Sequence, residues 1–325
     1  MEFISKILNK LSTYLPKDYS RVVAGIARSF SKNDYFPKFD EVITLLFYRF
    51  PIVRNKFLRI NKPLPEKFSK VDSAFFDFAF TSEKLLQLQS DGILTGIKLK
   101  PQLAQEIKNH LSSIDINWDG STITKDIDEI AKLTKADVSI AQAHYINPIR
   151  DGLISKMATD PALLSFASTY LRESELNLDV FAWWNFPVKK EDIKSNYFGD
   201  YNYAREFHFD HTSRRMFKIF IYLTDCDLQS GPHAYIKKSH LKRPLGISLR
   251  QANIDVESMK KYIPVDENWL TLTGEEGDCF AVDHYGMHCG IEPTHKSRLA
   301  LQFMYSVEPL GKKSFSTFLN VKNFI

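Results

Sequence analysis

The feature that most constrains the fold of this 325-residue chain is a series of short apolar segments in its second half, rich in β-branched and aromatic residues. Gly, Pro, Asp or Asn residues separate these segments, which is the pattern of strands joined by turns. The expected strands span residues 138–146, 178–188, 204–211, 216–224, 233–237, 269–273, 278–283, 287–291 and 298–307. So many short strands predict an antiparallel sandwich or jelly roll.

The chain before residue 85 has a helical pattern instead. Apolar residues recur at helical spacing between residues 3 and 15, and Pro16 ends that segment. Later apolar stretches are broken by Pro51 and Pro63. We expect residues 1–85 to form a helical extension packed on the main domain, with a short interfacial helix at its start as the alternative.

Two helices are expected near the front of the main domain, residues 86–325. An apolar face running from Leu103 to Leu111 marks the first helix. The second has Asp160 as its N-cap and Pro161 at its first position. The expected fold class is therefore α+β and β-rich, with helices covering the strands.

Composition and charge restrict the partners of the chain. It is 44% hydrophobic and 25% charged, as in an ordinary globular protein, and its net charge is only +4. Residues 1–85 carry 15 Lys and Arg against 9 Asp and Glu, but no dense basic run. A solvated helical face explains this excess better than contact with an anionic partner or a membrane surface does. No nucleic-acid partner is therefore expected.

The compartment is inferred from cysteines and from the start of the chain. The three cysteines form no CxxC motif, which favours a reducing environment. Glu2, Lys6 and Lys10 interrupt the first residues, so no signal peptide is expected. No apolar run is long enough to span a bilayer. We therefore expect a cytoplasmic protein without stable membrane insertion.

Candidate metal ligands lie in the segment Phe207-His-Phe-Asp-His211. Side chains alternate faces along a strand, so His208 and Asp210 point the same way, whereas His211 points to the other face. An imidazole and a carboxylate on one face bind one divalent metal. A second histidine from another strand would complete a two-His, one-carboxylate site with open positions, which suits Fe(II).

The third ligand is expected within residues 283–290. His288 is preferred because Gly290 follows two residues later, and a glycine lets the metal approach the backbone. His284 is the alternative. Arg298 begins the apolar strand that follows, and an arginine inside a barrel needs a carboxylate partner. A dicarboxylate cosubstrate would supply that partner through two parallel hydrogen bonds.

At these residues the chain resembles the phytanoyl-CoA dioxygenase family of iron and 2-oxoglutarate oxygenases. The resemblance covers about residues 86–308 and rests on segments 91–93, 204–210, 217–225, 230–240, 277–278 and 288–298. It implies a double-stranded β-helix, a jelly roll of the cupin type. It also implies that His208, Asp210 and His288 bind Fe(II), and that Arg298 binds the distal carboxylate of 2-oxoglutarate.

The resemblance also implies the reaction. Dioxygen and 2-oxoglutarate would be consumed, succinate and CO2 released, and an unactivated C–H bond of a small-molecule substrate oxidised, as expected in specialised metabolism. Hydroxylation is the default outcome, and desaturation or ring closure are the alternatives. The carboxylate of Asp210 argues against halogenation, because halogenating relatives have a small residue there.

Two positions depart from the family pattern, and a third is a further candidate for cosubstrate binding. Lys238 stands where the family usually has Gly before Ser-His, and Gly290 lacks a hydroxyl that some members use on the cosubstrate. Lys218 is a further candidate for cosubstrate binding, with a solvent-facing lysine as the alternative.

Two other functions are alternatives to an oxygenase for the same metal ligands. A non-catalytic, cupin-like metal-binding or sensor protein would not need Arg298. A zinc hydrolase would need a nearby general base and would also leave Arg298 unexplained.

The substrate itself is expected to be an anion, on the basis of one group of residues. Basic residues cluster after the metal strand and after the Gly-Pro turn, where positive charge at the barrel mouth would attract a carboxylate or phosphate. Ordinary solvated loop residues are the alternative explanation. The cluster consists of Arg214, Arg215, Lys237, Lys238, Lys242 and Arg243.

Overall fold

The computed structural model describes residues 50–57, 72–118, 123–135, 142–149, 152–187, 206–210, 213, 215–249, 254–308 and 317–324. The helix expected between residues 3 and 15 lies outside these ranges. No helix among the described residues is long and apolar enough to cross a bilayer.

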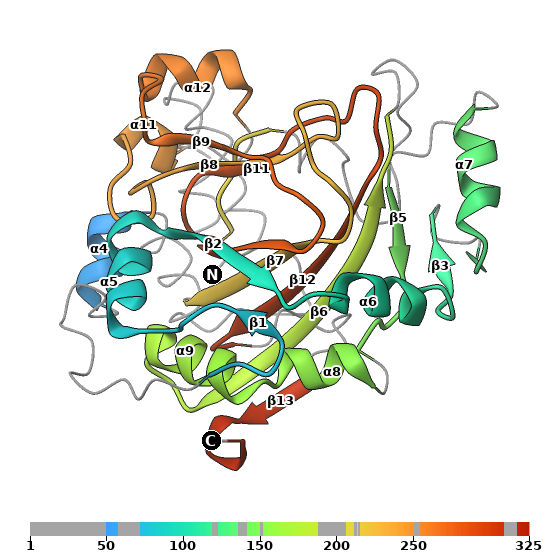
Figure 1. The fold of residues 1–325 in the computed structure, drawn as a ribbon. Coiled ribbons are helices and arrows are strands. Elements are labelled where there is room, and N and C mark those ends of the chain that lie inside the picture. Colours follow the sequence, from blue (N-terminus) through green and yellow to red (C-terminus); the bar gives the residue numbers. More distant parts are fainter. Residues whose placement is uncertain are drawn as a thin grey trace, which may run out of the picture.

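Two facing sheets dominate the molecule (Figure 1). The larger sheet has ten strands, and every pair in it is antiparallel. In order across its path it contains β1 (Phe76–Asp77), β2 (Ile93–Leu99), β10 (Asp278–Asp283), β7 (Met216–Tyr222), β12 (Arg298–Ser306), β6 (Glu175–Asn185), β5 (Gln142–Tyr145), β3 (Ile116–Asn117) and β4 (Ile123–Thr124), with β13 (Thr317–Asn320) paired to β6. The smaller sheet contains β11 (His288–Gly290), β8 (His233–Ile236) and β9 (Trp269–Leu272).

The chain passes back and forth between these sheets. After β6 in the large sheet, His208 forms a bridge with His288 beside the small sheet. The chain then returns to the large sheet as β7, forms β8 and β9 in the small sheet, and continues as β10, β11 and β12 in alternate sheets. This alternation is a jelly roll, so the predicted β-rich fold is confirmed.

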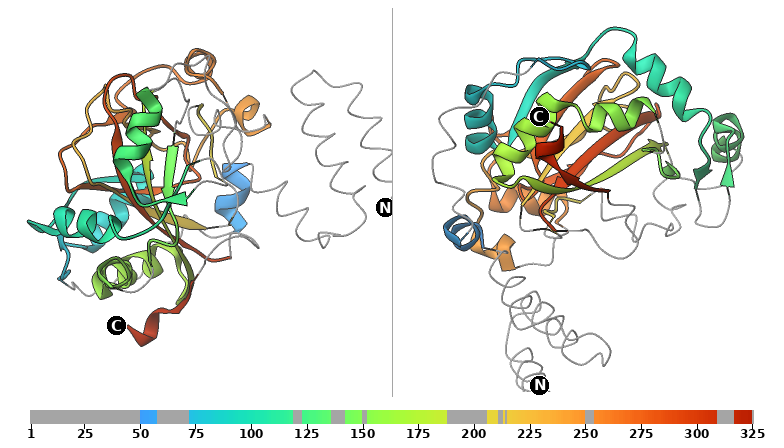
Figure 2. Two further views of the ribbon diagram at one scale, coloured as in Figure 1. Left: turned by 90° about the vertical axis from the view of Figure 1, so that its right-hand side faces the viewer. Right: turned by 90° about the horizontal axis from the view of Figure 1, so that it is seen from below.

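Helices cover the outer face of the large sheet. They are α5 (Ser82–Asp91), α6 (Leu103–Leu111), α8 (Leu153–Ala158) and α9 (Pro161–Leu171) (Figure 2). Their apolar side chains share one core with outward-facing residues of the strands. In β7, Phe217, Ile219 and Ile221 belong to this core, whereas Lys218 and Phe220 face the space between the sheets.

The predicted start of α9 is confirmed in detail. The Asp160 carboxylate accepts a hydrogen bond from the Leu163 backbone N–H at 3.1 Å, and Pro161 occupies the first turn, where no N–H is needed. The remaining described helices are α4 (Pro51–Phe57), α7 (Ile127–Lys135), α11 (Leu245–Leu249) and α12 (Val256–Tyr262), with a 3₁₀ turn, η2, at Val321–Asn323.

The structure differs from the sequence expectations in two places. Strand β2, which is not among the expected strands, lies between α5, capped by Gly92, and α6. In the expected strand 204–211, the described residues form only isolated bridges, at Phe207 and His208. The proposed division of the chain at residue 85 stays a prediction, and that residue lies within α5.

Candidate metal centre

A cavity of about 320 Å³ lies between the two sheets. Alternate residues of three neighbouring strands form its wall, which is expected because every second side chain of a strand faces the same way. These residues are 181, 183 and 185 of β6, 218, 220 and 222 of β7, and 298, 300, 302 and 304 of β12.

Three predicted ligands come together at this cavity. One ligand atom from each of His208, Asp210 and His288 lies within 4.8 Å of the others. The two histidines are partners in a β-bridge, with both backbone N–H···O distances at 2.9 Å, and their ring centroids are 4.3 Å apart. The backbone pairing therefore fixes the spacing of the two imidazoles.

The tautomer of each histidine is set by a backbone carbonyl. Nδ1 of His208 is 2.8 Å from the Glu206 oxygen, and Nδ1 of His288 is 2.9 Å from the Gly286 oxygen. Donation from Nδ1–H to a carbonyl directs the Nε2 lone pair towards a metal. Burial, together with the neighbouring His208, lowers the pKa of His288 to about 3, so His288 is neutral at physiological pH.

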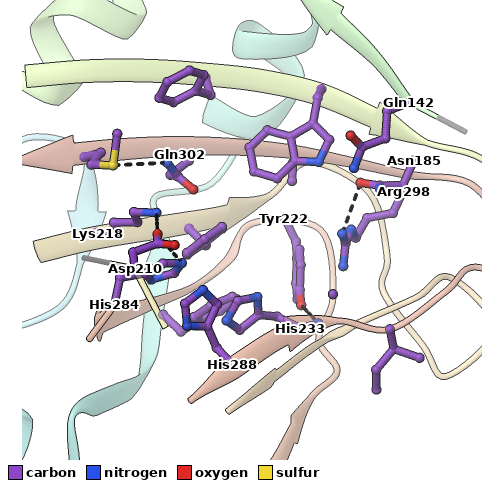
Figure 3. A pocket seen from close by; sticks show the side chains of 18 of the residues that line it. Gln142, Asn185, Asp210, Lys218, Tyr222, His233, His284, His288, Arg298 and Gln302 are labelled. Carbon is purple, nitrogen blue, oxygen red and sulfur yellow. Dashed lines mark hydrogen bonds and ion pairs between the residues drawn. The ribbon is translucent and has the colours of Figure 1, made fainter. Parts of the chain in front are cut away.

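Asp210 offers its two oxygens to different neighbours. Oδ2 accepts a hydrogen bond from Lys218 Nζ at 2.7 Å (Figure 3). Oδ1 is 3.9 Å from His208 Nε2. Burial alone would raise the pKa of Asp210, but Lys218, His288 and His208 lower it below its usual range. The carboxylate is therefore ionised, as a metal ligand must be.

Lys218 lies inside the barrel, because it is only 6% exposed and lines the cavity. The alternative of a solvent-facing lysine is therefore wrong. Its ammonium is paired with Asp210, and its contact with the cosubstrate stays a prediction.

Two further histidines surround the three ligands. His284 Nε2 is 3.8 Å from Asp210 Oδ2, but His284 is not part of the three-residue ligand group. The His233 ring stacks on His288 with centroids 5.5 Å apart. Burial lowers the pKa of both histidines well below the ordinary value, so they add no charge. Sequence reasoning gave His233 no role, although it directly follows the Gly-Pro pair. His211 lies outside the described residues.

Arg298 lies at the far end of the cavity from Lys218 (Figure 3). It is 5% exposed, and its Nη2 donates to Asn185 Oδ1 at 3.1 Å while Nη1 donates to the Gly231 carbonyl. Among the described residues, no carboxylate forms an ion pair with it. Asn185 is its direct cross-strand neighbour, a relation that appears only once the register of β6 and β12 is known.

The rest of the wall is neutral and largely aromatic. His144 stacks on Trp183, with ring centroids 6.1 Å apart and an interplanar angle of 16°. Burial lowers the pKa of His144 to about 3. Gln142 lies in the same wall, opposite Asn185 in the register, and Gln302 lies opposite Phe220. These side chains offer ring faces and amides to a ligand.

The described residues of the expected basic cluster do not line the cavity, and their role at its mouth stays a prediction. Arg215 pairs with Glu173 at 2.9 Å, and Lys237 lies 3.8 Å from Asp91. Arg243 is buried against the Phe209 ring at 3.6 Å. Of the six residues proposed, Arg214 lies outside the described ranges, and none of the others lines the cavity. Positive charge at the cavity comes instead from Lys218 and Arg298.

The departure from the family pattern at Lys238 has a structural explanation. Lys238 has a φ of 64°, the left-handed conformation that glycine adopts most easily. The turn before Ser239 and His240 therefore has the backbone shape that a glycine would give, although the residue is a lysine.

Comparisons with known proteins give distant structural similarities. No protein-family profile matches the sequence, and no curated protein matches it. The α-ketoglutarate-dependent epimerase SnoN from nogalamycin biosynthesis is 14% identical, covers 71% of this chain and 86% of its own, and has a TM-score of 0.47. EvdO2 from Micromonospora carbonacea var. aurantiaca, solved with 2-oxoglutarate, is 15% identical. The match covers 74% of this chain and 93% of EvdO2, with a TM-score of 0.46. The non-heme monooxygenase ThoJ is 10% identical, and the match covers 73% of this chain and 83% of ThoJ, with a TM-score of 0.43. Similarities of this size assign no function to the chain.

Proposed function

We propose that this chain is an Fe(II)- and 2-oxoglutarate-dependent oxygenase that oxidises a C–H bond of a small-molecule substrate, in specialised metabolism. One observation carries the proposal: the group His208, Asp210 and His288 shares a single cavity with the buried Arg298. Membership of the phytanoyl-CoA dioxygenase family is part of the proposal and rests on the sequence motifs alone.

The residues present fit the metal. Two imidazoles whose Nδ1 atoms contact backbone carbonyls, and one ionised carboxylate, form the donor set typical of non-haem Fe(II) sites. Lys218 pairs with Oδ2 of Asp210, which leaves Oδ1 on the side of His208. His208, Asp210 and His288 would hold the iron.

The fit to the cosubstrate depends on Arg298. Its hydrogen-bond partners, Asn185 and Gly231, are neutral, so a buried positive charge faces the cavity without a counter-ion among the described residues. A dicarboxylate that binds the metal at one end would offer its other carboxylate to this guanidinium. Nε of Arg298 is buried and has no hydrogen-bond partner among the described residues.

Bound iron and 2-oxoglutarate would supply the oxidising chemistry, in which dioxygen is consumed and succinate and CO2 are released. The chain contributes position and enclosure. Arg298 orients the cosubstrate, and the backbone pairing of His208 with His288 holds the ligands at a fixed spacing. The aromatic wall at Phe181 and Trp183 keeps water from the substrate. Hydroxylation is the simplest outcome, and desaturation or ring closure would use the same site.

The proposal is tested by succinate formation. The purified chain is given Fe(II), ascorbate, 2-oxoglutarate and panels of small acids, amino acids and acyl thioesters under air. Iron-dependent succinate is expected from the wild type and from His295→Ala, because His295 is exposed and not part of the ligand group. The variant His208→Ala/Asp210→Ala should form none. Equal succinate from the double variant would contradict the site assignment.

A further inference from the structure

Two arginines from distant parts of the chain contact the turn that carries His288. Arg54 of α4 is 2% exposed, and its guanidinium carbon lies 4.0 Å from the centre of the Tyr285 ring. Arg243, which follows the small-sheet strand β8, lies 4.3 Å from the same ring. Tyr285 lies in the turn between His284 and His288, so both cations contact the segment that supplies a metal ligand.

The same arrangement reaches the other ligand segment. Arg243 also lies 3.6 Å from the ring of Phe209, the residue between His208 and Asp210. Phe209 and Tyr285 pack edge to face at 5.5 Å. One aromatic pair with its arginine therefore joins the two ligand segments, behind the side chains that face the cavity.

Asp283 anchors this cluster at the start of the turn. Its Oδ2 accepts a hydrogen bond from Tyr170 at 2.9 Å and lies 3.6 Å from Arg54 Nη2, and its Oδ1 accepts from the Tyr285 backbone N–H at 2.9 Å. Burial would raise the pKa of Asp283, but Arg54 and then His240 lower it below its usual value. Arg54 and Asp283 thus form a buried ion pair that links α4 to the turn.

Helix α4 belongs to the part of the chain that the sequence set apart as an extension. It also contacts the loop after β8, because Asn55 Nδ2 donates to the Leu241 carbonyl at 3.1 Å. Its polar contacts are therefore directed at the two loops behind the metal centre. An independent appendage would not need a buried cation at this position.

We propose that α4 is a positioning element of the metal centre, and that Arg54 holds the turn 283–288 in the conformation that presents His288. The inference rests on the proposed metal site. Partners that orient the ligands of a metal commonly change its affinity by about 10- to 100-fold when they are removed. Loss of the Arg54 contact should therefore weaken metal binding, although Arg54 is not a ligand.

The test measures metal affinity in the full-length chain, with Co(II) as an air-stable spectroscopic probe for Fe(II). Arg54→Met should weaken Co(II) binding about tenfold or more. Lys56→Met is the matched control, because Lys56 is an exposed cation on the same helix, and it should bind Co(II) as the wild type does.

A second variant separates positioning from folding. Arg54→Met/Asp283→Asn removes both charges of the ion pair, so its thermal unfolding without metal should be closer to that of the wild type than the unfolding of Arg54→Met is. Its Co(II) affinity should still be about tenfold weaker than that of the wild type, with an altered visible Co(II) spectrum. A folded double variant with the Co(II) affinity and spectrum of the wild type would overturn the inference and leave the proposed function intact. A wild-type chain that binds no Co(II) would overturn both.

Discussion

The two buried arginines Arg54 and Arg298 differ in what compensates their charge. Arg54 lies 3.6 Å from the carboxylate of Asp283, which is itself buried. Arg298 donates to the neutral oxygens of Asn185 and Gly231, and its guanidinium lies 5.8 Å from the centre of the Tyr222 ring. Both side chains are at most 5% exposed, so burial alone does not distinguish them.

The difference lies in the source of the counter-charge. A buried cation is costly unless an anion compensates it. Asp283 compensates Arg54 within the folded chain, so that pair is part of the structure. No described carboxylate compensates Arg298, and this arginine faces a cavity next to three metal-ligand candidates. We therefore propose a role in folding and ligand positioning for Arg54, and a role in binding an anionic ligand for Arg298.

The largest effect on stability is expected at the internally paired arginine. Arg54→Met should lower the free energy of unfolding by about 3–5 kcal/mol, because it leaves the Asp283 carboxylate buried without its cation. Urea denaturation of the metal-free chain measures this change. Adding Asp283→Asn should recover much of the loss. An Arg54→Met chain as stable as the wild type would remove the contrast between the two arginines.

The largest effect on ligand binding is expected at Arg298. Arg298→Met should weaken 2-oxoglutarate binding by about 2–5 kcal/mol, because the distal carboxylate loses a charge-assisted pair. Pyruvate has no distal carboxylate, so its binding should be nearly unchanged. Calorimetric titration of both acids into the metal-loaded wild type and variant measures this coupling. An equal loss for pyruvate would mean that Arg298 does not contact the distal carboxylate.

A third basic group, the half-buried His144, loses its proton because it is shielded from water. Its pKa is lowered to about 3, compared with about 6.5 when unfolded. Its stabilising contribution is complete above pH 6.5 and is lost as the pH falls towards 3, because the unfolded chain then binds the proton more tightly. Between pH 6.5 and 5 this loss is about 1–2 kcal/mol.

The variant His144→Gln isolates this contribution. Its free energy of unfolding should fall less between pH 6.5 and 5 than that of the wild type, since glutamine does not titrate. Denaturant titrations at several pH values provide the comparison, and the other buried histidines contribute equally to both chains. Parallel pH profiles would show that His144 is not held neutral by burial.

The smallest effect is expected when Arg298 is replaced and the stability of the ligand-free chain is measured. Because no internal anion is left unpaired, Arg298→Met should change the free energy of unfolding by less than about 1 kcal/mol, or raise it. Thermal unfolding without metal or cosubstrate measures this. A loss as large as that of Arg54→Met would show that Arg298 is also compensated from within the fold.

Local sequence patterns were sufficient to predict much of the fold. Strands β7, β10 and β12 are largely apolar and almost entirely buried, and α9 carries its own cap at Asp160. Strand β2 was missed because Thr95, Gly96 and Lys98 interrupt its apolar pattern, although its pairing with β1 and β10 fixes it as a strand. Such pairing is a long-range interaction that a local pattern does not contain.

The same limit applies to the site. The spacing of His208 and Asp210 and the apolar strand after Arg298 are local, so these residues could be proposed from the sequence. Asn185 approaches Arg298 only through the register of β6 and β12, and Arg54 reaches Asp283 across more than 200 positions of sequence. The neutral wall with His144 likewise depends on which strands become neighbours.

The proposed site is tested most directly by anaerobic 2-oxoglutarate binding to the Fe(II)-loaded chain, measured by the visible charge-transfer absorption of the chelated cosubstrate. A saturable absorption band is expected for the wild type. The band should appear in Arg298→Met only at much higher 2-oxoglutarate concentration, and it should be absent from His208→Ala/Asp210→Ala. A wild-type chain without the band, or a double variant with the same band, would contradict the assignment of His208, Asp210 and Arg298.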